Sequence, residues 1–196
     1  MKTKTDNHNI FAKLDLRRRF LNRYPARSVL DCFMGSGEVW GRLRKDYAVK
    51  YWGVDVKPAK GRIKIDSERI LAQPGWGQDV VDLDAYGSPW AHWLALLSTC
   101  DHAVTVFLTV GLIQMGGGGG LSGAAKGALG IAFTRDMPQS LGGHLHDFAT
   151  GALLGVALRK FKVVECAEAL NPGGHARYFG IRLEPLRTPD EKNLSS

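Results

Sequence analysis

Residues 28–40 constrain the fold of this chain more than any other stretch. They read Ser-Val-Leu-Asp-Cys-Phe-Met-Gly-Ser-Gly-Glu-Val-Trp, so an apolar run ends in Asp31 and then passes through Gly35 and Gly37 into a helical pattern. A turn at the carboxyl end of a parallel strand needs the conformational freedom of glycine, and it leaves bare backbone where a ligand approaches. The stretch therefore predicts a strand, a tight turn and a helix start, with the ligand crevice of an open α/β sheet beside the turn.

The two glycines supply only part of the G-x-G-x-x-G dinucleotide fingerprint, which is a weak signal even when complete. Glu38 follows in the first helical turn, where its carboxylate favours the helix dipole but opposes a pyrophosphate bound at the same end. A zwitterionic cofactor without phosphate fits this turn better.

Composition limits the class of protein. The 196 residues suit one domain with a substantial core, and 44% hydrophobic with 23% charged residues is ordinary for a soluble globular protein. Cys32, Cys100 and Cys166 are odd in number, far apart and mostly embedded in apolar runs, which indicates buried thiols in a reducing compartment. We find no apolar secretory core, and the longest apolar run, at 103–115, is too short and polar to cross a bilayer. We therefore expect a cytoplasmic protein without membrane contact.

The amino-terminal region is basic. Residues 1–8 are polar, and an apolar stripe then predicts a helix that ends before Pro25. Five arginines fall within the eleven residues from 17 to 27: Arg17, Arg18, Arg19, Arg23 and Arg27. Together with a net charge of +7 they suit contacts to phosphates. A solvated helix face with no such partner remains the alternative.

Two further acids follow predicted strands. Residues 49–55 read as a strand that ends in Asp55, which lies 18 residues after Gly37 and so near the spacing at which an acid meets ribose hydroxyls in nucleotide-binding α/β units. A loop aspartate is the alternative. Residues 62–66 read as a third short strand that ends in Asp66, although Asp66 could equally cap a helix beginning at Ser67.

Residues 79–89 form the most informative segment. An apolar run there leads into Asp82, Asp84, Ala85 and Tyr86 and then into Gly-Ser-Pro. Parallel strands buried on both faces read as apolar runs, so acids at the strand exit are candidates for function.

At this point two motifs resemble a known family. Asp31-Cys-Phe33-Met-Gly35-Ser-Gly37 is similar to the D-x-F-x-G-x-G motif of S-adenosylmethionine-dependent methyltransferases that act on amino groups of nucleic-acid bases. The segment from Asp82 to Pro89 resembles the D-x-D-P-Y/F-G-S-P motif of tRNA guanine-N2 dimethyltransferases, and more loosely the D-P-P-Y motif of DNA amino-methyltransferases. Ala85 stands where the family has proline, which makes the backbone less rigid and is compatible with relaxed activity or with lost activity.

The resemblance implies a class I methyltransferase: α/β, with a Rossmann-like, seven-stranded, mostly parallel sheet, an antiparallel final hairpin and helices on both faces. It divides the chain into a basic helical extension (1–27), a methyltransferase domain (28–185) and a disordered tail (186–196). The implied cofactor is S-adenosyl-L-methionine, which Asp31, Phe33, Gly35, Gly37, Asp55 and Asp66 would bind. In that family the acid at Asp66 accepts a hydrogen bond from the adenine amino group.

The same resemblance assigns the chemistry. Asp84 would accept a hydrogen bond from the target amine and receive or relay its proton, while the Ala85 carbonyl holds the second hydrogen. Tyr86 would stack on an unpaired or flipped base, a contact worth roughly 1–3 kcal/mol. Asp82 could instead merely cap the following helix. We assign Pro89, Arg17, Arg18, Arg19 and Arg23 to the substrate side.

The rest of the chain supplies ordinary elements. We expect a helix at 88–100, a strand at 102–110, a long helix at 144–160 and a hairpin formed by 161–167 and 176–184. The five glycines at 116–120 predict a flexible substrate-side loop or a plain linker. His144 and His146 are two apart and do not share a face, so we predict no metal site there.

The sequence therefore predicts methyl transfer to an exocyclic base amine, on RNA in the first place and with guanine N2 as target. DNA adenine-N6 or cytosine-N4 methylation is the alternative, and a non-catalytic cofactor-binding module is another. A protein partner or a second copy of the chain would help a lone catalytic domain to grip its substrate.

Overall fold

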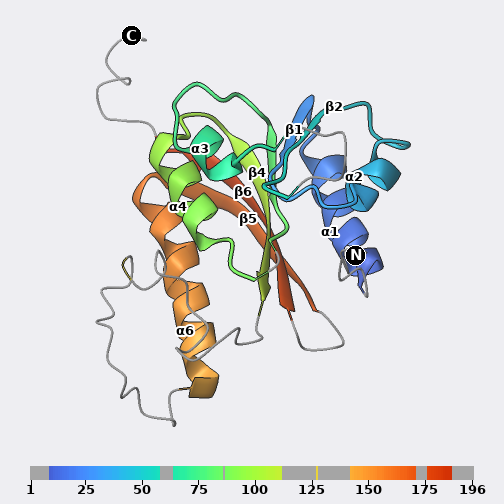
Figure 1. The fold of residues 1–196 in the computed structure, drawn as a ribbon. Coiled ribbons are helices and arrows are strands. Elements are labelled where there is room, and N and C mark those ends of the chain that lie inside the picture. Colours follow the sequence, from blue (N-terminus) through green and yellow to red (C-terminus); the bar gives the residue numbers. More distant parts are fainter. Residues whose placement is uncertain are drawn as a thin grey trace.

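The computed structural model describes residues 9–57, 64–85, 87–111, 127, 142–170 and 176–186, with backbone alone at 142–146 and 170. In this part of the chain a central sheet separates two layers of helices (Figure 1). The predicted glycine-rich loop at 116–120, the side chains of His144 and His146, and residues 187–196 of the predicted tail lie outside the described residues.

The sheet has the order β2-β1-β3-β4-β6-β5. Its strands are β1 (Ser28–Asp31), β2 (Lys50–Gly53), β3 (Val80–Leu83), β4 (Val104–Gly111), β5 (Phe161–Leu170) and β6 (Ala176–Pro185). The first four run parallel, whereas β6 is antiparallel to both β4 and β5. The predicted Rossmann-like sheet with a final antiparallel hairpin is thus confirmed.

The predicted count of seven strands is wrong for the described residues, which form six. The expected strand at 62–66 appears only as a single parallel bridge between Lys64 and Asp55. It would have extended the sheet beyond β2, whose own residues are exposed or half-buried. A short segment with two isoleucines among charged residues buries little apolar surface at such an edge.

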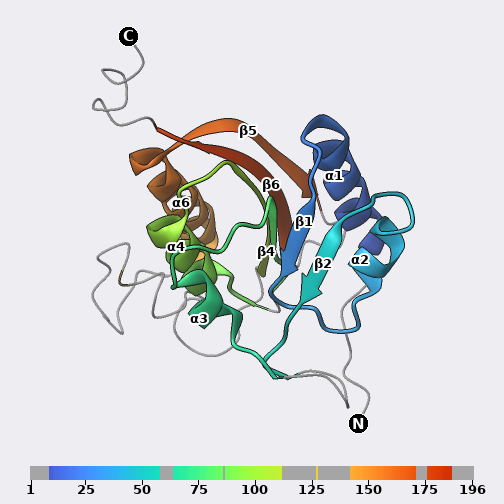
Figure 2. The same cartoon turned by 90° about the horizontal axis from the view of Figure 1, so that it is seen from above.

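Helices cover both faces of the sheet (Figure 2). One layer contains α1 (Ile10–Arg23) and α2 (Glu38–Leu43). The other contains α3 (Ser67–Leu71), α4 (Trp90–Thr99) and α6 (Gly142–Gly155), with a final 3-10 turn at Val156–Arg159. No helix of the described residues has the length and apolar character that crossing a membrane requires.

The strands alternate between the two cores, as a pleated sheet with helices on both sides demands. Val29 and Phe107 pack toward α1 and α2, whereas Leu30 and Leu108 pack toward α4 and α6. These side chains are at most 1% exposed. Apolar runs without polar alternation were therefore the correct signal for the parallel strands.

Helix α1 forms one wall of this core. Phe20 meets Phe107 of β4 edge to face with ring centroids 5.8 Å apart, and it lies directly over Gly180 of β6. The predicted division of the chain at residues 27/28 and 185/186 remains a prediction. The packing shows that α1, on the amino-terminal side of that division, is anchored to the sheet.

Candidate functional site

The turn after β1 has the conformation that its glycines predicted. Gly35 has a φ of 48° and Gly37 a φ of 73°, both in the left-handed region that side chains rarely adopt. Gly37 is the residue that precedes α2, so the turn leads directly into the helix. The bare backbone lies at the carboxyl end of β1, where α/β sheets bind their ligands.

Asp55 reaches this turn from the far end of β2. Its Oδ2 atom accepts a hydrogen bond from the Gly35 N–H at 2.9 Å, and its Oδ1 atom accepts one from the Lys57 N–H at 2.7 Å. The spacing of 18 residues therefore brings the acid beside the glycines. Each carboxylate oxygen keeps a second lone pair, so hydrogen bonding to a ribose remains a prediction that this geometry allows.

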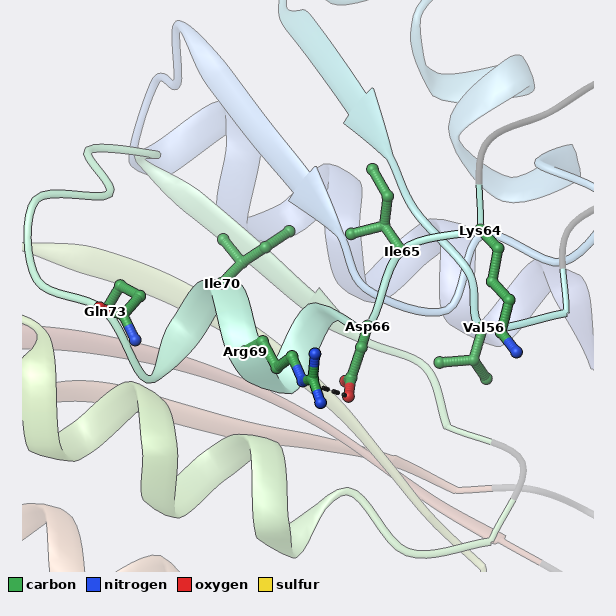
Figure 3. A pocket seen from close by; sticks show the side chains of 7 residues that line it. All are labelled: Val56, Lys64, Ile65, Asp66, Arg69, Ile70 and Gln73. Carbon is green, nitrogen blue, oxygen red and sulfur yellow. Dashed lines mark ion pairs between the residues drawn. The ribbon is translucent and has the colours of Figure 1, made fainter.

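Asp66 is the N-cap residue of α3, as the alternative interpretation predicted. Its Oδ1 atom accepts the Glu68 N–H at 3.1 Å, and Oδ2 lies 3.7 Å from Arg69 Nε. The side chain is 47% exposed and borders an open hollow of about 820 Å³ (Figure 3). The hollow is lined by Val56, Lys64, Ile65, Asp66, Arg69, Ile70 and Gln73.

Asp31 is buried at the end of β1. It stands opposite Asp82 in the β1–β3 register, and its Oδ2 atom accepts a hydrogen bond from the Tyr51 hydroxyl at 2.8 Å. Burial, followed by the charge of Asp82, raises the pKa of Asp31 to about 8, although the bond from Tyr51 and the charge of Arg17 oppose this. The amide of Phe33 also points to Asp31, at 3.3 Å from Oδ1.

Asp82 forms a buried ion pair with α1. Arg17 donates to both of its oxygens, from Nε at 2.7 Å and from Nη2 at 2.6 Å, and Trp40 Nε1 adds a third bond at 2.6 Å. The ion-paired side chains are at most 2% exposed. The alternative role of Asp82 as a helix cap is wrong, because its carboxylate bonds to Arg17 and Trp40 and no side chain of the described residues caps α4.

Asp84 lies two residues further along, at the exit of β3. Lys13 Nζ donates to its two oxygens at 2.7 and 2.8 Å, and the Thr109 hydroxyl donates to Oδ1 at 2.6 Å. Burial alone would raise the pKa of Asp84, but the charges of Lys13 and Arg17 and the hydrogen bonds from Lys13 and Thr109 outweigh it and lower that pKa. The carboxylate is ionised at neutral pH, and 18% of the side chain is exposed.

The loop after Asp84 is fastened to β4. Ala85 is buried, and its N–H donates to the Leu83 carbonyl at 2.9 Å. Gly87 has a φ of 115°, and its carbonyl accepts the Gly111 N–H at 2.8 Å. Pro89 is buried at the start of α4, while Tyr86 lies outside the described residues.

The amino-terminal arginines do not form one surface. Arg17 points into the protein, so it is a structural residue here and its expected place on the substrate side is not supported. Arg18 pairs with Asp15 and Asp46, and its side chain is 40% exposed. Arg19 and Arg23 lie on the surface, 59% and 66% exposed, and both pair with Glu165 of β5.

Sequence reasoning missed Lys13. A signal was present, because Lys13 and Arg17 share the helix face of Ile10, Leu14 and Phe20 at spacings of three and four residues. A cation within an apolar stripe is rarely buried without a partner. Two such cations on α1 therefore pointed to buried acids on the neighbouring sheet.

Comparisons with known proteins rest on structure alone. No family model matches the chain, and no curated protein matches its sequence significantly. Among solved structures, Trm1 from Pyrococcus horikoshii, in complex with S-adenosyl-L-methionine, aligns with a TM-score of 0.63 and 18% identity over 92% of this chain. The aligned part is 56% of that protein, so the chain spans little more than half its length.

Two further structures cover most of both chains. Magnesium protoporphyrin IX methyltransferase from Synechocystis, with bound SAH, has a TM-score of 0.52 at 14% identity and covers 91% of this chain and 83% of its own. N-methyltransferase NodS from Bradyrhizobium japonicum, in complex with S-adenosyl-L-homocysteine, has a TM-score of 0.51 at 9% identity and covers 94% and 90%. The molecule thus has the Rossmann-like fold of S-adenosylmethionine-dependent methyltransferases.

Proposed function

We propose that this protein is an S-adenosylmethionine-dependent methyltransferase that methylates an exocyclic amino group of a nucleic-acid base, with RNA as the substrate and guanine N2 as the target. The observation that carries the proposal is an ionised, partly exposed carboxylate, Asp84, at the exit of the strand beside the glycine turn. Asp82, two residues before it, is paired in register with Asp31 of β1.

The residues present fit a zwitterionic adenosyl cofactor. The left-handed glycines expose backbone beside the Asp55 carboxylate, which suits ribose hydroxyls, and the buried Asp31 carboxyl precedes the same turn. The hollow begins at Val56, which follows Asp55 in the chain, and it combines apolar side chains such as Ile70 with the Asp66 carboxylate. The carboxylates of Asp55 and Asp66 would repel a pyrophosphate. The cofactor, when bound, supplies a methyl group on a positively charged sulfur.

Asp84 would stabilise the positive charge that develops on the target amine during methyl transfer. The lone pair of an exocyclic base amine is delocalised into the ring, and nitrogen gains positive charge as it attacks. A carboxylate that accepts a hydrogen bond from the amine stabilises that charge, an effect of about 10²–10³-fold in rate by analogy with one oxyanion-hole hydrogen bond. The Ala85 carbonyl is adjacent in the chain and would hold the second hydrogen.

The preference for RNA rests on motif resemblance and on charge. Arg18, Arg19 and Arg23 expose 40–66% of their side chains on one helix. Phosphates would compete with Glu165 for Arg19 and Arg23, so binding should weaken steeply with salt. A chain that spans 56% of Trm1 would grip its substrate with these arginines, with a second copy or with a protein partner.

The test is methyl transfer from radiolabelled cofactor to separate pools of tRNA, ribosomal RNA and duplex DNA, followed by identification of the nucleoside. We expect label on a guanine of RNA. Asp84→Ala should lower transfer at least about 100-fold while cofactor affinity changes less than about threefold. Asp101→Asn is the matched control, because Asp101 is 82% exposed and lies before β4, at the opposite end of the strand from Thr109.

A second candidate, a cofactor-binding module without methyl transfer, is favoured by two observations. Lys13 occupies both oxygens of Asp84, and Ala85 replaces the proline of the resembled motif. Cofactor binding by the wild-type protein without label on any pool would decide for this module. Transfer that is unchanged in Asp84→Ala would remove Asp84 from the mechanism.

A further inference from the structure

The contact between Lys13 and Asp84 joins the first described helix to the strand end that carries the candidate chemistry. The two residues are 71 positions apart in sequence, yet Lys13 Nζ lies 2.7 and 2.8 Å from the two carboxylate oxygens. The Lys13 side chain is 8% exposed, and its ammonium also lies 5.2 Å from the centre of the Tyr178 ring. Because these contacts and burial restrict the Lys13 side chain, its ammonium has few other positions that it can adopt.

The hydrogen bonds around Asp84 can be counted against its lone pairs. Each carboxylate oxygen accepts two hydrogen bonds. In the described part of the chain, Lys13 and Thr109 fill Oδ1, while Lys13 takes one position on Oδ2. Arg17 Nη2 is 4.0 Å from Oδ2, which is beyond hydrogen-bond reach. One acceptor position on Oδ2 is left for a substrate.

We propose that Lys13 is the positioning residue of Asp84, which it keeps ionised and oriented so that the single remaining lone pair of Oδ2 faces the target amine. The inference rests on the proposed function. It changes the role of Asp84, which accepts a hydrogen bond throughout the reaction and does not become the base.

The bonds, electron pairs and protons of methyl transfer can be accounted for without protonation of Asp84. The amine nitrogen forms the new N–C bond with its own electron pair, and the electron pair of the broken C–S bond stays on sulfur. The methylated nitrogen then carries an extra proton, which leaves to water. Asp84 stabilises the positive charge until that proton departs, and Lys13 prevents the carboxylate from capturing it.

Other charges around Asp84 act in known directions. Arg17 of α1 supports the ionised form of Asp84. Asp84 in turn helps to raise the pKa of Asp31 at the end of neighbouring β1. The Tyr178 ring faces Lys13 from β6. Removal of Lys13 leaves a largely buried carboxylate with the Thr109 hydroxyl as a donor and Arg17 4.0 Å away, so its protonation becomes easier.

The first experiment follows Asp84 directly. Carbon-13 NMR of protein labelled at the aspartate carboxyl is recorded from pH 4 to 8, with the Asp84 signal identified by its loss in Asp84→Asn. In wild type we expect the Asp84 carboxylate to titrate below the ordinary aspartate value, because Lys13 and Arg17 lower its pKa. In Lys13→Met the titration midpoint should move up by at least one pH unit, and in Lys13→Arg it should stay near the wild-type value. Lys50→Met is the control, because Lys50 is an exposed cation on β2 and its removal should leave the Asp84 titration unchanged.

The second experiment measures methyl transfer against pH. The acidic limb of the profile should move to higher pH in Lys13→Met by the same interval and return in Lys13→Arg, while cofactor affinity stays within threefold. If the Lys13→Met variant does not fold, the Lys13→Gln variant is measured in its place. An unshifted Asp84 titration in the folded Met or Gln variant overturns the inference. Lack of transfer by wild type would refute the proposed function alone, because the NMR titration still decides the role of Lys13.

Discussion

Replacement of Arg17 by methionine separates the two interpretations of the amino-terminal arginines. Among the described residues, Arg17 makes two of the three hydrogen bonds to the Asp82 carboxylate, and the side chains of Arg17 and Asp82 are both excluded from solvent. Methionine keeps most of the volume of the arginine stem but leaves the Asp82 carboxylate buried with the indole N–H of Trp40 as its remaining donor. Removal of one partner of a buried ion pair costs about 3–5 kcal/mol.

That loss is large compared with the free energy of unfolding of a typical domain, about 5–15 kcal/mol. Arg17→Met should therefore lower the urea midpoint strongly, as followed by circular dichroism at pH 7. The double variant Arg17→Met with Asp82→Asn should recover part of the loss, because no unpaired charge stays buried.

Arg19→Met is the matched control for this experiment. Arg19 is on the same helix but 59% exposed, and its ion pair with Glu165 lies at the surface. Such pairs contribute about 0–1 kcal/mol, so stability should change little. Its RNA affinity at low salt should fall and become less sensitive to ionic strength. Arg17→Met with wild-type stability and reduced RNA affinity would refute the structural role of Arg17.

Two further variants test other parts of the site and core. Because the pKa of buried Asp31 is raised to about 8 from an ordinary 3.8, the folded state alone holds a proton between these values, and stability falls as pH rises through this window. From pH 5 to pH 9, Asp31→Asn should therefore avoid a loss of up to about 4 kcal/mol in the free energy of unfolding. Equal losses in wild type and variant would contradict this. Gly180→Ala would place its Cβ 2.6 Å from the buried Phe20 ring and should destabilise by about 1–3 kcal/mol in urea unfolding, whereas Gly41→Ala, which meets no atom within 4 Å, should not destabilise.

Local sequence signals predicted most of the fold. The helix that ends before Pro25, the strand and glycine turn at 28–37 and the final hairpin are all present. Hydrophobic periodicity, turn chemistry and glycine φ are properties of neighbouring residues, which is why they can be read directly. The predicted strand at 62–66 is reduced to a single bridge. The prediction used only the local sequence pattern, whereas the stability of an edge strand depends on the residues that cover it.

The site was predicted less completely, since its charges are shared between distant segments. The sequence indicated that Asp82 and Asp84 matter, but we assigned Arg17 to the substrate side and overlooked Lys13. Both cations face acids 65 and 71 residues away. No local pattern specifies which acid a buried cation will meet, although their place in an apolar stripe indicated that some acid would be found.

The sequence by itself determined the order of strands and helices, the glycine turn and the acids at the strand ends. The tertiary structure alone decided the charge state of those acids. Packing of α1 on the sheet brings two cations against Asp82 and Asp84 and none into hydrogen-bond contact with Asp31, so Asp84 stays ionised while the pKa of Asp31 rises. Proton affinity in a protein interior depends on burial and on the nearest charges, and α1 brings those charges together from far along the chain.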